Sequence, residues 1–129
     1  SRGSGPAGHA DWPTFDPDVL GGNYQGHYGA GPVCTVTRAA GAGNHPILAG
    51  IRLPLTSNGS LYRTSPLAAG TTLLLVGAIP GQEPEPVAWT NRYKKSRIFY
   101  TSLGHPDDFQ NAPFRRLLVN AVRWALDTP

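Results

Sequence analysis

A histidine and two carboxylates follow one another closely after a strand-like segment in the last third of the chain. Gly104 breaks that segment, and His105, Pro106, Asp107 and Asp108 come next. Histidine changes its protonation state near neutral pH, so an imidazole beside a carboxylate suits general acid–base catalysis. We therefore predict that His105, assisted by Asp107 or Asp108, carries the chemistry. The alternative is that His105 only caps the loop or hydrogen-bonds within it.

A second group of polar and aromatic residues lies near the N-terminus, in a stretch rich in glycine and proline. Long loops of this kind are usually either functional or disordered. Aromatic rings stack on the C–H faces of sugars while imidazoles bind hydroxyl groups, so we expect a sugar to bind here. The alternative for the histidine of the glycine-rich turns is that it bonds free backbone groups. The predicted sugar-binding residues are His9, Trp12, Tyr24 and His27.

Three histidines could also share a divalent metal ion such as zinc. Imidazole nitrogen is a common zinc ligand, and an aspartate could complete the set. The candidate ligands are His9, His27 and His105, with Asp11 and Asp108 as available carboxylates. Their spacing does not follow a compact pattern such as His-x-x-x-His, so sugar binding without a metal is the alternative.

Nucleophilic catalysis has little support in the sequence. The single cysteine, Cys34, falls within a predicted strand, where a buried thiol behaves as a small hydrophobic residue. Neither a Gly-x-Ser-x-Gly nor a Gly-x-Cys-x-Gly elbow is present. Amidotransferase and serine-hydrolase mechanisms are therefore disfavoured.

Several runs of apolar and β-branched residues predict the strands that would position these groups. The run 71–79 is apolar throughout most of its length, which is typical of a buried central strand. The polar residues 91–96 predict a hairpin loop between the last two strands, and His45-Pro46 predicts a turn. The predicted strands are 32–37, 71–79, 86–90 and 97–102, with a shorter one at 61–63.

Helical periodicity follows the His105 loop. Pro113 suits the first turn of a helix, because its missing N–H would have no partner there. The polar loop between a strand end and this helix is where open α/β sheets bind ligands. The expected apolar face comprises Phe114, Leu117, Leu118, Ala121, Val122 and Ala125. The expected solvent face comprises Arg115, Arg116, Asn120 and Arg123.

Composition limits the class of protein. The chain has 129 residues, 40% of them hydrophobic and 15% charged, which suits one domain with a modest core. No apolar run is long enough for a membrane helix, so we expect no membrane partner. We expect residues 1–7 to be a flexible leader and residues 8–129 to form the domain. Both the cytoplasm and export after signal removal fit as compartments.

Basic residues gather in the loop between the last two predicted strands. The net charge of +3 is mild, so nucleic-acid binding is not favoured. A short charged turn is ordinary solvated surface. Contact with an acidic partner or a phosphate is the alternative for Arg92, Lys94, Lys95 and Arg97.

Several motifs together resemble the trehalose-utilisation (ThuA-like) family over roughly residues 8–126. The C-terminal motif runs from Pro86-Val-Ala-Trp through Arg97-Ile-Phe-Tyr-Thr-Ser-Leu-Gly-His105 to Ala121-Val-Arg-Trp124-Ala. The earlier motifs are His9-Ala-Asp-Trp-Pro13, Gly21-Gly22, Gly26-His27 and His45-Pro46. The resemblance implies an α/β, flavodoxin-like three-layer fold related to class I glutamine amidotransferases. In those relatives a histidine in a His-Pro-Glu motif, at a place similar to His105, is a triad base.

The chain also departs from the family pattern. The usual N-terminal half of alternating strands and helices does not precede the His9 motif. We therefore expect only the C-terminal half or a trimmed form of the fold, completed by another chain or by a homo-oligomer. Lys94-Lys95-Ser96-Arg97 replaces an expected Gly-Lys-Gly-Arg turn, and Gly59-Ser60 replaces an expected acidic pair.

Two functions remain open at this point. The resemblance implies carbohydrate utilisation, with His-based acid–base chemistry on trehalose-type or oxidised disaccharides. The replacement of the acidic pair by Gly59-Ser60 favours the alternative, a non-catalytic sugar-binding or assembly module.

Overall fold

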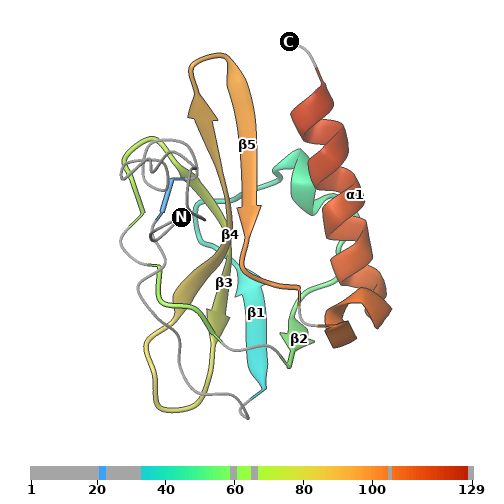
Figure 1. Cartoon of the computed structure of the whole chain (residues 1–129). Helices are drawn as coiled ribbons and strands as arrows, with labels where there is room; N and C mark the ends of the chain where they lie inside the picture. Colours follow the sequence, from blue (N-terminus) through green and yellow to red (C-terminus); the bar gives the residue numbers. More distant parts are fainter. Residues whose placement is uncertain (1–20, 23–32, 59–60, 65–66, 105, 128–129) are drawn as a thin grey trace, which may run out of the picture.

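A computed structural model describes residues 21–22, 33–58, 61–64, 67–104 and 106–127, and the expected leader lies outside them. Eight elements follow one another in the described chain (Figure 1). They are β1 (Cys34–Arg38), the 3-10 helix η2 (Pro46–Leu48), β2 (Leu55–Ser57), β3 (Thr72–Ala78), β4 (Glu85–Tyr93), β5 (Ser96–Thr101), the 3-10 helix η3 (Pro106–Gln110) and α1 (Ala112–Leu126).

The strands form one sheet in the order β2-β1-β3-β4-β5. The predicted central position of residues 71–79 is confirmed, because β3 lies in the middle. The predicted hairpin is confirmed as well, since β4 and β5 pair with Trp89 opposite Tyr100 and Tyr93 opposite Ser96. The predicted loop at 91–96 is too long, because only residues 94–95 join the two strands. The predicted strand at 61–63 is reduced to an isolated bridge at Tyr62.

The sheet and its helix confirm a mixed α/β fold, but every described strand pair is antiparallel. The expected doubly wound sheet would be mainly parallel. A parallel pair needs a crossover of a dozen or more residues, usually a helix. Residues 79–84 join β3 to β4, and residues 94–95 join β4 to β5, so neither connection is long enough. Helix α1 follows the last described strand and makes no crossover.

The tight turn of the β4–β5 hairpin places a lysine in an unusual backbone conformation. Lys94 has a φ of 57°, in the left-handed region that glycine adopts without strain. The resemblance leads one to expect glycines around this turn. The hairpin therefore forms without them, and Lys94 Nζ lies 5.3 Å from the centre of the Tyr93 ring.

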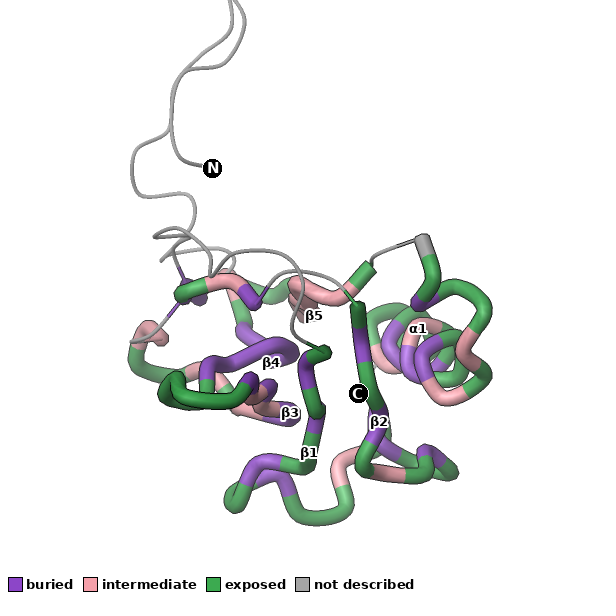
Figure 2. The backbone as a smooth tube through the Cα atoms, turned by 90° about the horizontal axis from the view of Figure 1, so that it is seen from below, coloured by how far each residue is buried: buried purple, intermediate pink, exposed green. Residues whose placement is uncertain are grey.

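Both faces of the sheet are covered. Strand β4 is buried continuously from Glu85 to Asn91, which a sheet with one wet face would not allow (Figure 2). Helix α1 covers one face and contacts β5, η2 and η3. On the other face Gly22 lies against the Trp89 ring and Leu67, and the Gly21 carbonyl accepts a hydrogen bond from the Ala68 N–H at 2.7 Å.

Helix α1 confirms the predicted helix but not all of its predicted faces. Phe114, Leu117 and Ala121 are buried as expected. Asn120, expected in solvent, is buried, and its amide donates to the carbonyls of Ile47 at 2.9 Å and Ala49 at 2.8 Å. Val122 and Ala125, both expected on the buried face, are exposed, Val122 to 58%. The buried face is rotated because α1 packs against η2 and the following Ala49, where the carbonyls of Ile47 and Ala49 need a donor.

No helix among the described residues is long and apolar enough to cross a membrane.

We predict that Gly22→Ala destabilises the fold while Gly41→Ala does not. A Cβ at Gly22 would lie 2.8 Å from both the Leu67 side chain and the Trp89 ring. Forcing an extra methyl into such a site costs about 1–3 kcal/mol. Nothing lies within 4 Å of a Cβ at Gly41, so that variant is the matched control. Urea unfolding measures both, and equal stabilities of the two variants would contradict the packing described here.

Candidate functional site

The predicted site residues divide into two groups. Asp107 and Asp108 are described, whereas the other predicted residues lie outside the described part of the chain. Those outside are His9, Trp12, Tyr24, His27 and His105. The site is therefore built from the loop that surrounds the aspartate pair.

Asp108 is a buried carboxylate that ties the loop to the far edge of the sheet. It is 4% exposed, and its Oδ2 accepts hydrogen bonds from the Ser57 hydroxyl and from the Gly104 N–H, both at 2.9 Å. A buried charge of this kind requires such donors to be tolerated. Asp108 therefore links Gly104, on the other side of position 105, to its own segment and joins both to Ser57 at the end of β2.

Asp107 has the more accessible carboxylate of the pair. Its side chain is exposed, and its Oδ2 accepts a hydrogen bond from the Asn58 amide at 3.1 Å. Two consecutive residues at the end of β2, Ser57 and Asn58, thus hold the two aspartates. Sequence reasoning missed both partners, and a serine and an asparagine about 50 residues upstream carry no signal that could have singled them out.

The end of β5 is also fixed by hydrogen bonds. The Thr101 hydroxyl donates to the Val87 carbonyl at 2.7 Å and accepts from the Leu103 N–H at 3.1 Å. The Ser102 N–H donates to the same Val87 carbonyl at 3.1 Å. These bonds therefore fix residues 101–103, which lead from β5 into the loop.

The arrangement can present a polar group rigidly at the edge of the sheet. The buried Asp108 carboxylate is occupied by its donors and acts on the loop. The exposed Asp107 carboxylate can accept a proton or a hydroxyl hydrogen bond from a ligand. A base or acid acts only within hydrogen-bond reach of the proton that it moves, so the hydrogen-bonded position of Asp107 is an advantage for such a group.

Cys34 is not placed for nucleophilic chemistry. It lies in β1 and is buried. Burial raises the pKa of its thiol, and the charge of Asp108 acts in the same direction. The thiol stays protonated at neutral pH, so the expectation that Cys34 is a poor nucleophile is confirmed.

Two aromatic groups flank the sheet away from the aspartate pair. Trp89 is buried and stacks on Tyr100 with ring centres 4.3 Å apart. Burial raises the pKa of the Tyr100 hydroxyl, and Tyr62 adds to the shift. Trp124 of α1 lies with its ring centre 5.5 Å from that of His45. Trp89 is therefore a core residue, as expected, and Trp124 is a half-buried rim residue.

His45 begins η2, as the predicted turn at His45-Pro46 implies. Its Nδ1 accepts a hydrogen bond from the Ile47 N–H at 3.2 Å. Burial lowers the pKa of His45, and the charge of Arg97 lowers it further. The imidazole is consequently neutral at physiological pH, and it serves as a cap for the turn.

The described residues contain no group of three or more His, Cys, Asp and Glu side chains that could hold a metal ion. All three histidines predicted as ligands lie outside that part of the chain.

The fold is that of an α/β protein in which polar residues, held by hydrogen bonds, follow the end of β5. A family model described as trehalose utilisation (ThuA) matches residues 3–125. The chain therefore belongs to the ThuA trehalose-utilisation family, and the resemblance drawn from its motifs is confirmed. A search of curated proteins finds no match.

We predict that Asp108→Ala destabilises the fold by about 3 kcal/mol or more, because two hydrogen bonds to a charged acceptor are lost, each worth about 1.5–3 kcal/mol. Asp107→Ala removes an exposed bond and should change stability by about 0.5 kcal/mol or less. Urea denaturation, monitored by tryptophan fluorescence, measures the free energy of unfolding of both variants. Equal losses in the two variants would refute the anchoring role of Asp108.

Proposed function

We propose that this chain is a carbohydrate-utilisation enzyme that acts on trehalose-type or oxidised disaccharides. His105 performs general acid–base chemistry on the sugar. The observation that carries the proposal is the attachment of Asp108 to both Gly104 and Ser57, because it holds the chain on either side of His105. Membership of the trehalose-utilisation family supports the substrate class.

The two aspartates have different parts in this proposal. Asp108 positions the loop, since its carboxylate is occupied by buried donors. Asp107 assists His105 at the exposed side of the loop. Its carboxylate hydrogen-bonds a sugar hydroxyl or stabilises the imidazolium that forms when His105 takes a proton.

The N-terminal residues complete the site in the proposal. Trp12 and Tyr24 stack on the apolar faces of the sugar, and His9 and His27 bind its hydroxyl groups. A divalent ion such as zinc, held by His9, His27 and His105, would polarise a sugar oxygen. The flavodoxin-like, amidotransferase-related arrangement belongs to the same proposal. It requires parallel strands from outside the described residues, because those described are antiparallel.

We expect His105→Ala to abolish turnover and leave the thermal unfolding midpoint unchanged. Loss of a general acid–base group typically lowers the rate by about 10²–10⁴-fold. The assay monitors consumption of trehalose and of its oxidised derivatives by chromatography with mass detection. Unchanged turnover in this variant would remove His105 from the mechanism.

His45→Ala is the matched control for this experiment. His45 lies near the C-terminal end of α1, whereas the His105 loop precedes the N-terminal end, about 20 Å away at 1.5 Å per helical residue. Its loss should leave turnover within about twofold of the parent chain. The same assay with added zinc and with a chelator tests the metal. Turnover that is insensitive to both would separate the sugar chemistry from a metal site.

One observation favours a second candidate, an assembly module. Three apolar side chains form an exposed stripe on α1: Val119, Val122 and Leu126, which are 46%, 58% and 76% exposed. Their spacing places them on one side of the helix. An exposed apolar helix stripe of this kind is typical of a surface that binds another protein chain.

If the stripe binds a second copy of this chain, the second candidate predicts a dimer that Val122→Glu converts to a monomer. A carboxylate in an apolar interface would lose its hydration without gaining a partner. Size-exclusion chromatography with light scattering measures the mass over a range of concentrations. Val33→Glu, at a similarly exposed valine before β1, is the control and should leave the mass unchanged. A parent chain that is monomeric at every concentration would exclude self-assembly through this stripe.

A further inference from the structure

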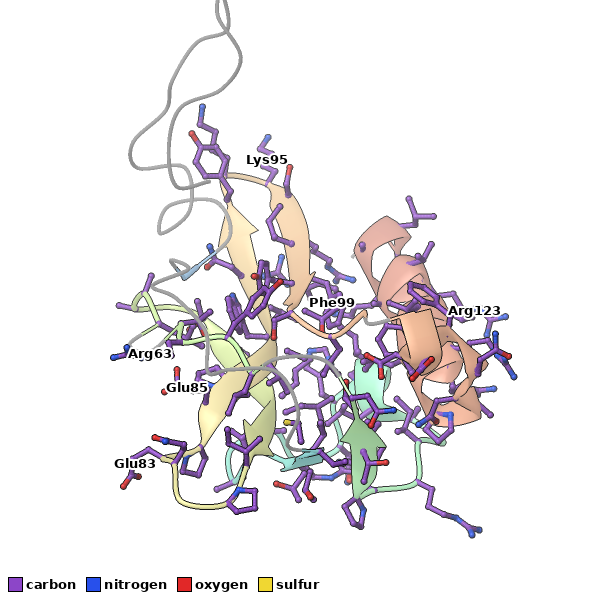
Figure 3. The ribbon with its side chains drawn as sticks, turned by 60° about the horizontal axis from the view of Figure 1, so that its bottom comes forward. Arg63, Glu83, Glu85, Lys95, Phe99 and Arg123 are labelled. Carbon is purple, nitrogen blue, oxygen red and sulfur yellow. The ribbon has the colours of Figure 1, made fainter. Side chains whose placement is uncertain are left out.

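A pocket of about 350 Å³ lies between the β4–β5 hairpin and the C-terminal end of α1. The hairpin tip and this end of α1 lie at the same end of the molecule (Figure 1), and Lys95 marks the tip in Figure 3. The polar side chains that line it are Arg92, Lys95, Ser96, Arg97 and Asp127. The pocket is therefore built by two strands, their turn and the end of the helix.

The charges in this pocket are unbalanced. Three cations face a single carboxylate, Asp127, which leaves a net charge of +2. Arg92 and Arg97 are direct cross-strand partners, and like charges in that position destabilise a sheet. Among the described residues neither the Arg92 side chain nor the Lys95 side chain has a hydrogen-bond or ion-pair partner. Repulsion between these cations therefore destabilises the hairpin, and a bound anion would offset that repulsion.

Arg97 is held in place at the wall of the pocket. Its Nη1 donates to the Trp124 carbonyl at 2.8 Å, and its guanidinium carbon lies 5.1 Å from the centre of the Trp124 ring. Its Nε is buried and has no hydrogen-bond partner within the described residues. The bond to the Trp124 carbonyl also offsets the partial negative charge at the helix end, which would otherwise repel an anion.

We propose that this pocket binds the phosphate group of a small phosphate monoester. A phosphate monoester carries a charge of about −1.5 to −2 at neutral pH, which matches the net charge of the lining residues. Guanidinium groups form paired hydrogen bonds with phosphate oxygens, and Ser96 and Lys95 supply further donors. The volume is suited to a ligand of monosaccharide size.

This site is separate from the one around Asp107. The pocket lies against the last turn of α1, and the aspartate pair precedes its first turn. Fifteen helical residues span about 22 Å at 1.5 Å per residue, so one small molecule cannot occupy both. The phosphate site is a second binding site, and it stands whether or not the loop after β5 is catalytic.

The test is calorimetric titration of the 129-residue chain with glucose 6-phosphate, inorganic phosphate and glucose. We expect glucose 6-phosphate to bind and glucose to show no binding. The double variant Arg92→Gln/Lys95→Gln should weaken binding about tenfold or more, because two charged contacts are lost. Inorganic phosphate that binds as tightly as glucose 6-phosphate would also support the site and would identify the free ion as its ligand.

Lys94→Gln is the control, because it removes one positive charge from the same hairpin at a position that does not line the pocket. It should change the affinity by less than about threefold. Thermal unfolding shows whether the variants remain folded, and phosphate should raise the midpoint of the parent chain but not that of the double variant. The proposal is overturned if the parent chain binds no phosphate, if the double variant binds it equally well, or if glucose binds as tightly as its phosphate.

Discussion

The two hydrogen bonds of the Asp108 carboxylate connect the opposite edges of the sheet. In the order β2-β1-β3-β4-β5, Ser57 belongs to one edge strand and Gly104 follows the other. A flat sheet would hold these two edges far apart, so the Asp108 contacts require the sheet to curl. The polar loop after β5, and with it the candidate site, depends on that curl because Ser57 and Asn58 reach the aspartates only across it.

Helix α1 is attached to the rest of the fold by polar contacts along its whole length, in addition to its apolar face. The Asp108 loop precedes its first turn, and Arg97 bonds the Trp124 carbonyl near its end. Between them the Asn120 amide bonds the carbonyls of Ile47 in η2 and of Ala49, which follows η2. Each of these contacts joins residues that lie far apart in the sequence. The helix therefore has a fixed orientation, and the two polar sites at its ends keep a constant separation.

Local patterns in the sequence predicted helix α1 and most of the strands, but not β2 (Leu55–Ser57). Long-range contacts determined what the sequence could not predict. The apolar run of β3 and the period of α1 are properties of neighbouring residues, so they were predictable. The buried Asn120 was not, because its partners Ile47 and Ala49 lie more than 70 residues upstream. The pairing direction of the strands and the anchoring of Asp108 by Ser57 are long-range features of the same kind.

The turn of the β4–β5 hairpin also determines which side chains of β5 face helix α1. Its register depends on the two-residue turn that contains Lys94. Side chains alternate between the faces of a strand, so a slip of one residue would carry Arg97 to the opposite face. The last turn of α1 would then lose the donor to the Trp124 carbonyl. The length of the turn at the hairpin tip thus determines which face of β5 meets the helix.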